Sequence, residues 1–139
     1  MADFNDWNQK IIEEFRSAGG QVGGQFAGAP VLLLTSTGAK TGQKRTTPMM
    51  YLADDDDLVV FASKAGAPTN PDWYHNLVAH PRASVEVGTE TCEVDAEVAT
   101  RRERDRLYAI QAERYPGFAE YQEKTTRVIP VVILRRVAS

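Results

Sequence analysis

The segment 31–53 constrains the fold most, because it places an apolar strand, a glycine-containing basic loop and a second strand in immediate succession. The apolar run 31–34 enters the loop 35–45, which contains two glycines, three cations and several hydroxyl side chains. Two β-branched threonines and then Pro48 favour a strand rather than a helix after the loop. The pattern predicts a β-hairpin whose turn carries positive charge.

This loop is interpreted as a binding site for an anion. Its glycines allow backbone N–H groups to turn toward one point, and Lys40, Lys44 and Arg45 supply positive charge. No acidic residue occurs between Ser36 and Ala53, although the whole chain has a net charge of −3. A nucleotide P-loop is excluded because the G-x-x-x-x-G-K-[ST] spacing and the following helix are absent. A basic, solvated hairpin turn remains the alternative.

A second motif at 58–77 supports the anion site. It predicts a strand that ends beside Lys64, followed by a short helix with a proline in its first turn. Helix N-termini attract anions. We therefore expect Lys64 to join Lys40 and Arg45 around one elongated anion, and two aromatic side chains to flank a ring attached to that anion, namely Trp73 and Tyr74.

The rest of the chain predicts a small barrel. Alternating residues at 83–87 and 91–99 predict a hairpin with its turn at Gly88. A capping box at 100–103 opens a helix, a short helix follows it, and the last strand is predicted at 131–137. Hairpins dominate the order, which predicts an α+β, mainly β fold: an antiparallel sheet closed into a barrel, with an N-terminal helix and helices at the rim.

Several classes of function are disfavoured. The two histidines, His75 and His80, have no acid or cysteine at ligand spacing, so no metal site is expected, and the four acids 54–57 predict a solvated turn. Nucleic-acid binding is disfavoured because the basic residues concentrate in one loop of an acidic chain. The single cysteine, Cys92, excludes an internal disulfide and fits a reducing cytoplasm.

Residues 34–48, 62–77 and 114–122, together with the strand that follows Arg127, resemble the deazaflavin-dependent nitroreductase family of actinobacteria and relatives. Members are split β-barrel oxidoreductases, within the FMN-binding split-barrel superfamily, that use coenzyme F420. The motifs are G-x-K-T-G-x-x-R in the first segment and A-S-K in the second. The resemblance covers nearly everything after Gly28. It implies hydride transfer from a reduced deazaflavin.

By the same resemblance, the phosphodiester and oligoglutamate tail of coenzyme F420 is the anion held by Lys40, Arg45 and Lys64. Other loop residues are implied to hydrogen-bond to the cofactor, namely Thr41, Gly42 and Gln43. Further residues are implied to border its ring and linker, namely Pro48, Met49, Trp73, Tyr74 and Asn76. The cofactor supplies the chemistry, so no side chain is expected to act as a nucleophile.

The expected partner is a small, electron-poor hydride acceptor in a pocket walled by Met50, Tyr51, Ser63, Tyr115, Phe118 and Tyr121. Ser63 is the candidate catalytic residue, because it can donate a hydrogen bond to an oxygen that gains negative charge as hydride arrives. Nitro-activating members of the family line this pocket with tyrosines. Met50 and Phe118 depart from that pattern, so quinones and conjugated lactones or enones are equally expected acceptors. The alternatives are an FMN-dependent oxidoreductase and a non-catalytic carrier of coenzyme F420.

The N-terminal part, 1–28, is expected to comprise an amphipathic helix and a glycine-rich linker before a barrel domain at 29–139. The helix has Phe4, Trp7, Ile11 and Phe15 on one face. That face is expected to pack on the core or, as the resemblance permits, to wall the substrate mouth or rest on a membrane surface. A cytoplasmic monomer or homodimer is expected, without a signal peptide.

Overall fold

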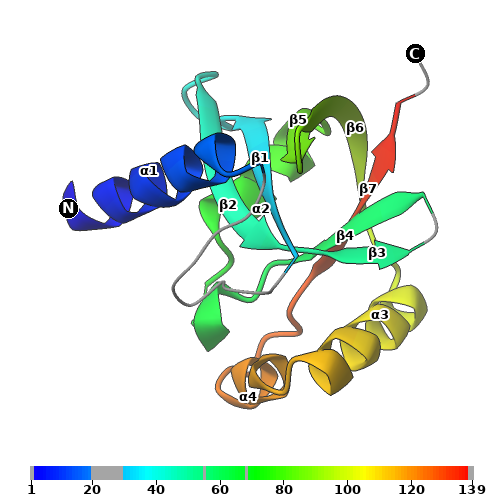
Figure 1. The fold of residues 1–139 in the computed structure, drawn as a ribbon. Coiled ribbons are helices and arrows are strands. Elements are labelled where there is room, and N and C mark those ends of the chain that lie inside the picture. Colours follow the sequence, from blue (N-terminus) through cyan, green and yellow to red (C-terminus); the bar gives the residue numbers. More distant parts are fainter. Residues whose placement is uncertain (1, 20–29, 55, 68, 138–139) are drawn as a thin grey trace.

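The computed structural model describes residues 2–19, 30–54, 56–67 and 69–137 (Figure 1). All strand pairs in the described sheet are antiparallel, and their order is β2-β1-β5-β6-β7-β4-β3. The strands are β1 Val31–Thr37, β2 Lys44–Met50, β3 Leu52–Asp54, β4 Asp57–Phe61, β5 Arg82–Val87, β6 Glu90–Val98 and β7 Val131–Arg136. The helices are α1 Ala2–Ser17, α2 Asp72–Ala79, α3 Arg101–Arg114 and α4 Gly117–Glu123, with a short 3-10 turn, η2, at Lys64–Gly66.

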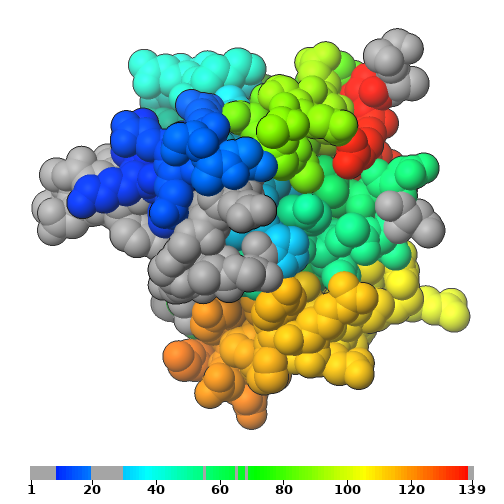
Figure 2. Space-filling view, viewed as in Figure 1, coloured from blue at the N-terminus to red at the C-terminus, as the bar shows by residue number. Residues whose placement is uncertain are grey.

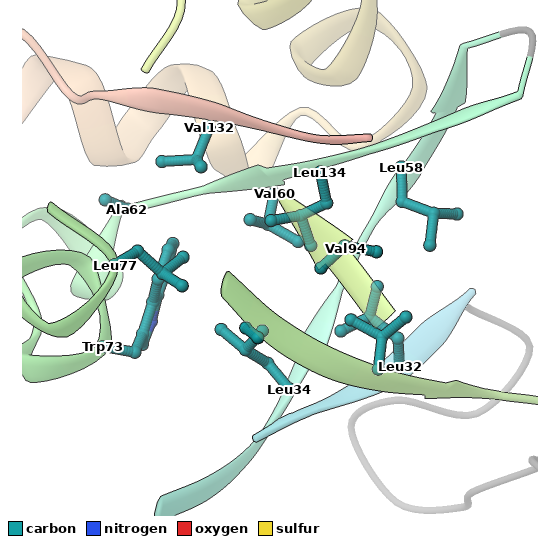
Figure 3. Packing of buried hydrophobic residues seen from close by; sticks show 12 residues of the cluster. Leu32, Leu34, Leu58, Val60, Ala62, Trp73, Leu77, Val94, Val132 and Leu134 are labelled. Carbon is teal, nitrogen blue, oxygen red and sulfur yellow. The ribbon is translucent and has the colours of Figure 1, made fainter. Parts of the chain in front are cut away.

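The sheet curls until β2 contacts β4, which gives a half-barrel of the split-barrel type predicted from the sequence. Its interior is filled by a first core cluster that includes Leu34, Val60 and Leu134. Figure 3 shows Trp73 and Leu77 extending from α2 into this interior beside Leu34. Since fully burying one large apolar side chain contributes about 1.5–3 kcal/mol, these two residues fix α2 firmly against the barrel.

Helix α1 lies against the outer face of β1. Strand β1 is apolar at four successive positions because both of its faces are covered. Ile12 and Phe15 pack on Val31 and Leu33, so the buried face includes Ile12, whereas Ile11, predicted for that face, is only half-buried. The side chains of Phe4 and Trp7 and the linker 20–29 lie outside the described residues. No described helix has the length and apolar character needed to span a membrane.

Helices α3 and α4 also lie on the outer face of the curled sheet, over β3, β4 and β7. Leu107 and Phe118 pack on Leu52 and Val59 in a second core cluster, and the space-filling view shows α3 below the β3–β4 hairpin, with α4 beside α3 (Figure 2). The predicted cap is present, because the Thr100 side chain accepts a hydrogen bond from the Glu103 N–H at 3.4 Å. The packing of Phe118 and the contacts with α3 and η2 hold α4 in place at one rim of the barrel.

The segment 46–53, predicted as one strand, is divided between β2 and β3. β2 pairs with β1 and β3 pairs with β4. The division falls at Tyr51, whose N–H donates to the Pro30 carbonyl at 3.1 Å. The expected acidic turn joins β3 to β4, and the residues that flank it, Asp54 and Asp57, form exposed ion pairs with arginines of α3 and β7.

Candidate active site

A cleft of about 1300 Å³ opens between β2, the loop after β1, the turn η2, α2 and α4. Most of the residues predicted for the site line it, namely Lys40, Thr41, Arg45, Pro48, Met49, Met50, Ser63, Lys64, Trp73, Asn76, Phe118 and Tyr121. The sequence did not point to other lining residues, namely Gln9, Ile12, Gly38, Ala39, Thr46, Thr47, Phe61, Pro71, Asp72 and His75. The contribution of Gln9 and Ile12 makes α1 part of the cleft wall.

Five predicted residues do not line this cleft. Tyr51 and Tyr74 pack against the first core cluster, and Tyr115 packs against the second. Gly42 and Gln43 lie exposed at the tip of the loop. The sequence pattern identifies these residues as neighbours of the site along the chain, but the direction of each side chain depends on packing between distant elements.

The cations of the cleft are free of acidic partners. Lys40, Arg45 and Lys64 are exposed, and in the described part of the chain none forms an ion pair with a carboxylate. Lys44 belongs to the same loop but donates to the Thr37 hydroxyl at 3.0 Å and does not line the cleft. Among the described lining residues, Asp72 is the one acid. The cleft therefore presents unneutralised positive charge.

The backbone of the basic loop is largely occupied by its own turn. The N–H groups of four loop residues already donate within the protein, over 2.8–3.2 Å, namely Gly38, Ala39, Gly42 and Gln43. Gly42 adopts a φ of +72°, a conformation that glycine adopts at little cost. Recognition of an anion by this loop must consequently depend on its side chains more than the sequence suggested.

Asn76 fixes the loop to α2. Its side-chain oxygen accepts from the Ala39 N–H at 2.9 Å, and its amide nitrogen donates to the buried Ser36 hydroxyl at 3.4 Å. The N-terminus of α2 is less suited to an anion than expected. Pro71 is the N-cap, and Asp72 places a carboxylate in the first turn.

The turn after β4 presents Ser63 and Lys64 to the cleft. Lys64 has a φ of +46°, which makes it the one non-glycine residue with positive φ in the described chain. Ser63 is half-buried, and its hydroxyl has no hydrogen-bond partner among the described residues. A non-glycine residue in the left-handed region often marks a functional position, because the surrounding structure must maintain its strain.

The other side of the cleft is aromatic. Phe118 and Tyr121 share one face of α4 with ring centroids 5.3 Å apart, and Phe61 lies 5.7 Å from Phe118. Behind them, the Tyr108 hydroxyl donates to the Phe118 carbonyl at 2.6 Å, and burial raises the pKa of Tyr108 to about 12. Phe61, the last residue of β4, was not predicted to line the site.

His75 lines the cleft and is exposed, with its ring centroid 5.6 Å from that of Tyr74. The described residues contain no group of three or more histidine, cysteine or acidic side chains that could hold a metal ion. The cleft combines the three cations, the aromatic side chains of Phe61, Phe118 and Tyr121, and the Ser63 hydroxyl. This arrangement suits a long anionic ligand that carries a flat ring.

A curled antiparallel half-barrel with a cleft of this kind is the split-barrel architecture. Residues 7–136 match the model of a family described as F420H(2)-dependent quinone reductase. The chain belongs to this family. Its class as an oxidoreductase that uses reduced coenzyme F420 on an electron-poor acceptor, predicted from the sequence, is thereby confirmed.

Individual relatives agree with this assignment. The F420H(2)-dependent quinone reductase Rv1261c of Mycobacterium tuberculosis (strain ATCC 25618 / H37Rv) is 42% identical over 126 residues, which are 88% of this chain and 85% of that protein. A solved F420-H2 dependent reductase, FDR-A, superposes with a TM-score of 0.70 at 40% identity, covering 76% of this chain and 94% of the other. A structure described as a domain-swapped dimer has a TM-score of 0.72 and 36% identity, covering 94% and 98%.

Proposed function

We propose that this protein reduces a quinone, with the anionic tail of coenzyme F420 on Lys40, Arg45 and Lys64 and with the acceptor beside the aromatic wall of α4. One observation carries the proposal: three cations without acidic partners in the described chain open into the same cleft as that wall. The reduced cofactor supplies a hydride when it is bound. The printed name of the mycobacterial relative supports a quinone as acceptor.

The residues present fit this cofactor. A cleft of about 1300 Å³ has room for both a ring system and a second, smaller molecule. The exposed cations match the phosphodiester and carboxylates of the tail, and Met49 and Trp73 contribute apolar surface to the same cleft. FMN, the alternative cofactor, carries a single phosphate and would leave part of the positive charge of Lys40, Arg45 and Lys64 without a partner.

We assign two tasks to the protein's own groups. The apolar wall excludes water from the acceptor and orients it against the cofactor, which is how a protein assists a reaction whose chemistry belongs to a cofactor. The Ser63 hydroxyl donates to the acceptor oxygen, and this hydrogen bond strengthens as negative charge develops there. Phe61 and Phe118 offer no hydrogen bonds, so a flat, largely apolar quinone suits this pocket better than a nitro compound.

The experiment measures affinity and turnover separately. The protein is titrated with coenzyme F420 and with FMN, and reoxidation of reduced F420 is then followed with menadione, a conjugated enone or a nitroarene. We expect tighter binding of F420 than of FMN, and reoxidation above the protein-free rate that is fastest with menadione. A faster rate with the nitroarene would contradict the assignment of a quinone, and binding of FMN alone would contradict the assignment of the tail site.

The charge argument has a matched control in the same loop. Lys40→Ala and Arg45→Ala should each weaken F420 binding by about 1.5 kcal/mol, the low end for charge-assisted hydrogen bonds, because both side chains are exposed. Lys44→Ala removes the same charge from a side chain that does not line the cleft, and should bind F420 nearly as the unmodified protein does. Equal losses in all three variants would indicate a general effect of charge. Ser63→Ala should lower turnover more than cofactor affinity.

A further inference from the structure

We propose that Arg127 is a positioning residue for the reaction: its guanidinium holds the segment 62–70 in the conformation that presents Ser63 and Lys64 to the cleft, and ties that segment to α4. This inference rests on the proposed function, because it assigns a role in cofactor binding to a residue that does not itself line the cleft.

The guanidinium of Arg127 donates hydrogen bonds to four acceptors in the segment 62–70. Its Nε donates to the Ala67 carbonyl at 2.8 Å and its Nη2 to the Ser63 carbonyl at 2.8 Å. Its Nη1 donates to the Ala62 carbonyl at 3.0 Å and to the Asn70 side-chain oxygen at 2.8 Å. These contacts join residues that are 57–65 positions away from Arg127 in the chain.

All four acceptors are neutral, so Arg127 forms no ion pair in the described structure. The residue is half-buried, and burial lowers the pKa of its guanidinium, although arginine stays charged in proteins. A half-buried charge without an acid costs desolvation energy, which the four hydrogen bonds offset. Such an arrangement indicates a role in holding a particular backbone conformation.

The segment needs holding because its conformation is strained. Lys64 has a φ of +46°, and Gly66, two residues later, has a φ of +81°. Within the turn, the Gly66 N–H donates to the Ser63 carbonyl and the Ala67 N–H to the Lys64 carbonyl. A positive φ at a lysine costs about 1–2 kcal/mol and persists only where surrounding contacts determine it. Arg127 supplies three contacts to the backbone on both sides of this strained turn.

The same residue links the turn to the acceptor side. The Arg127 carbonyl accepts from the Gln122 side chain at 2.7 Å, and the Gln122 oxygen accepts from the Ile129 N–H and the Arg104 guanidinium. Gly66 packs so closely on α4 that an added Cβ would lie 2.8 Å from the Tyr121 carbonyl oxygen. The cofactor side at Lys64 and the acceptor side at Tyr121 therefore form one connected unit.

The test is a double-mutant cycle on affinity for coenzyme F420. Arg127→Lys keeps the positive charge but cannot reach four acceptors, because lysine lacks the planar fork. Lys64→Ala removes the cation that we expect the turn to present, and should weaken binding about tenfold. Since Arg127 acts through the turn, Arg127→Lys should weaken binding several-fold. The double variant should bind no more than about twofold more weakly than Lys64→Ala alone.

Arg135→Lys is the control, because Arg135 lies on β7, is exposed and pairs with Asp57 and Glu97 rather than with the turn. It should bind F420 as the unmodified protein does. If Arg127→Lys does not fold, Asn70→Ala replaces it in the cycle. This variant removes the side-chain oxygen that accepts a hydrogen bond from Arg127 Nη1. We expect Asn70→Ala to weaken binding of coenzyme F420 less than Arg127→Lys does, and to have little further effect when Lys64 is already alanine.

Unchanged affinity in Arg127→Lys would overturn the proposal, and so would losses that multiply in the double variant, which is what a merely structural role predicts. Unchanged affinity in Lys64→Ala would also overturn it and would remove Lys64 from the tail site. Losses in Lys40→Ala and Arg45→Ala would then still support reduction of a quinone with coenzyme F420. Failure of the unmodified protein to bind coenzyme F420 would instead contradict the proposed function itself.

Discussion

Replacing Lys64 by glycine is expected to stabilise the protein relative to Lys64→Ala while weakening cofactor binding. Lys64 has a φ of +46°. A side chain in that conformation costs about 1–2 kcal/mol, whereas glycine avoids this cost but loses about 0.5–1 kcal/mol through its greater freedom in the unfolded chain. Lys64→Gly should therefore have a free energy of unfolding about 0.5–1 kcal/mol higher than Lys64→Ala.

Both variants lack the ammonium group, so the comparison isolates backbone strain from charge. For a domain of this size the net gain corresponds to a rise of about 2 °C in the melting temperature of Lys64→Gly over Lys64→Ala. The assay is thermal unfolding without ligand, followed by titration with coenzyme F420, which should bind about tenfold more weakly to both. If the alanine variant melted at the same temperature or higher, positive φ at this turn would not be a source of strain.

Three further predictions follow from particular residues. Gln111 is fully buried, and neither polar atom of its side chain has a hydrogen-bond partner among the described residues, so Gln111→Met should stabilise the protein by about 1 kcal/mol in urea unfolding. A loss of stability would reveal a partner for the amide. Burial raises the pKa of Tyr108 to about 12 in the folded protein. The phenol therefore ionises first in the unfolded chain, and the free energy of unfolding should decline between pH 10 and 12. In Tyr108→Phe, which also lacks the hydrogen bond to the Phe118 carbonyl, this part of the decline should disappear. Affinity for coenzyme F420 should fall on raising NaCl from about 0.05 to 0.5 M, because the cleft cations are exposed; an unchanged affinity would mean that buried groups bind the tail.

The parts of the fold that local chemistry determines were predicted correctly. The hairpin around Gly88 and the cap at Thr100 depend on residues within a few positions of each other. The division of 46–53 into β2 and β3 was not predicted. Each half pairs with a different strand, and the residues of the segment do not specify which partner closes the barrel.

The same distinction explains the site. Lys40, Arg45 and Lys64 were found from charge pattern and resemblance, and the structure brings all three to one cleft. Arg127 was quoted only as part of the terminal strand motif, because its contacts with 62–70 join segments far apart in the chain. Sequence reasoning finds the groups that can bind a ligand more readily than the groups that hold them in place.

The distribution of charge explains how such a site can exist in a stable protein. Arginines outside the cleft, such as Arg106 and Arg135, pair with Asp54 or Asp57 and with nearby glutamates. An exposed ion pair contributes at most about 1 kcal/mol, so leaving Lys40, Arg45 and Lys64 unpaired costs the fold little. Each of these cations remains available to a ligand that brings several negative charges at once. On the proposed function, these cations are available to a polyanionic tail at little loss of stability, and the hydrogen bonds of the half-buried Arg127 hold the strained turn at Lys64.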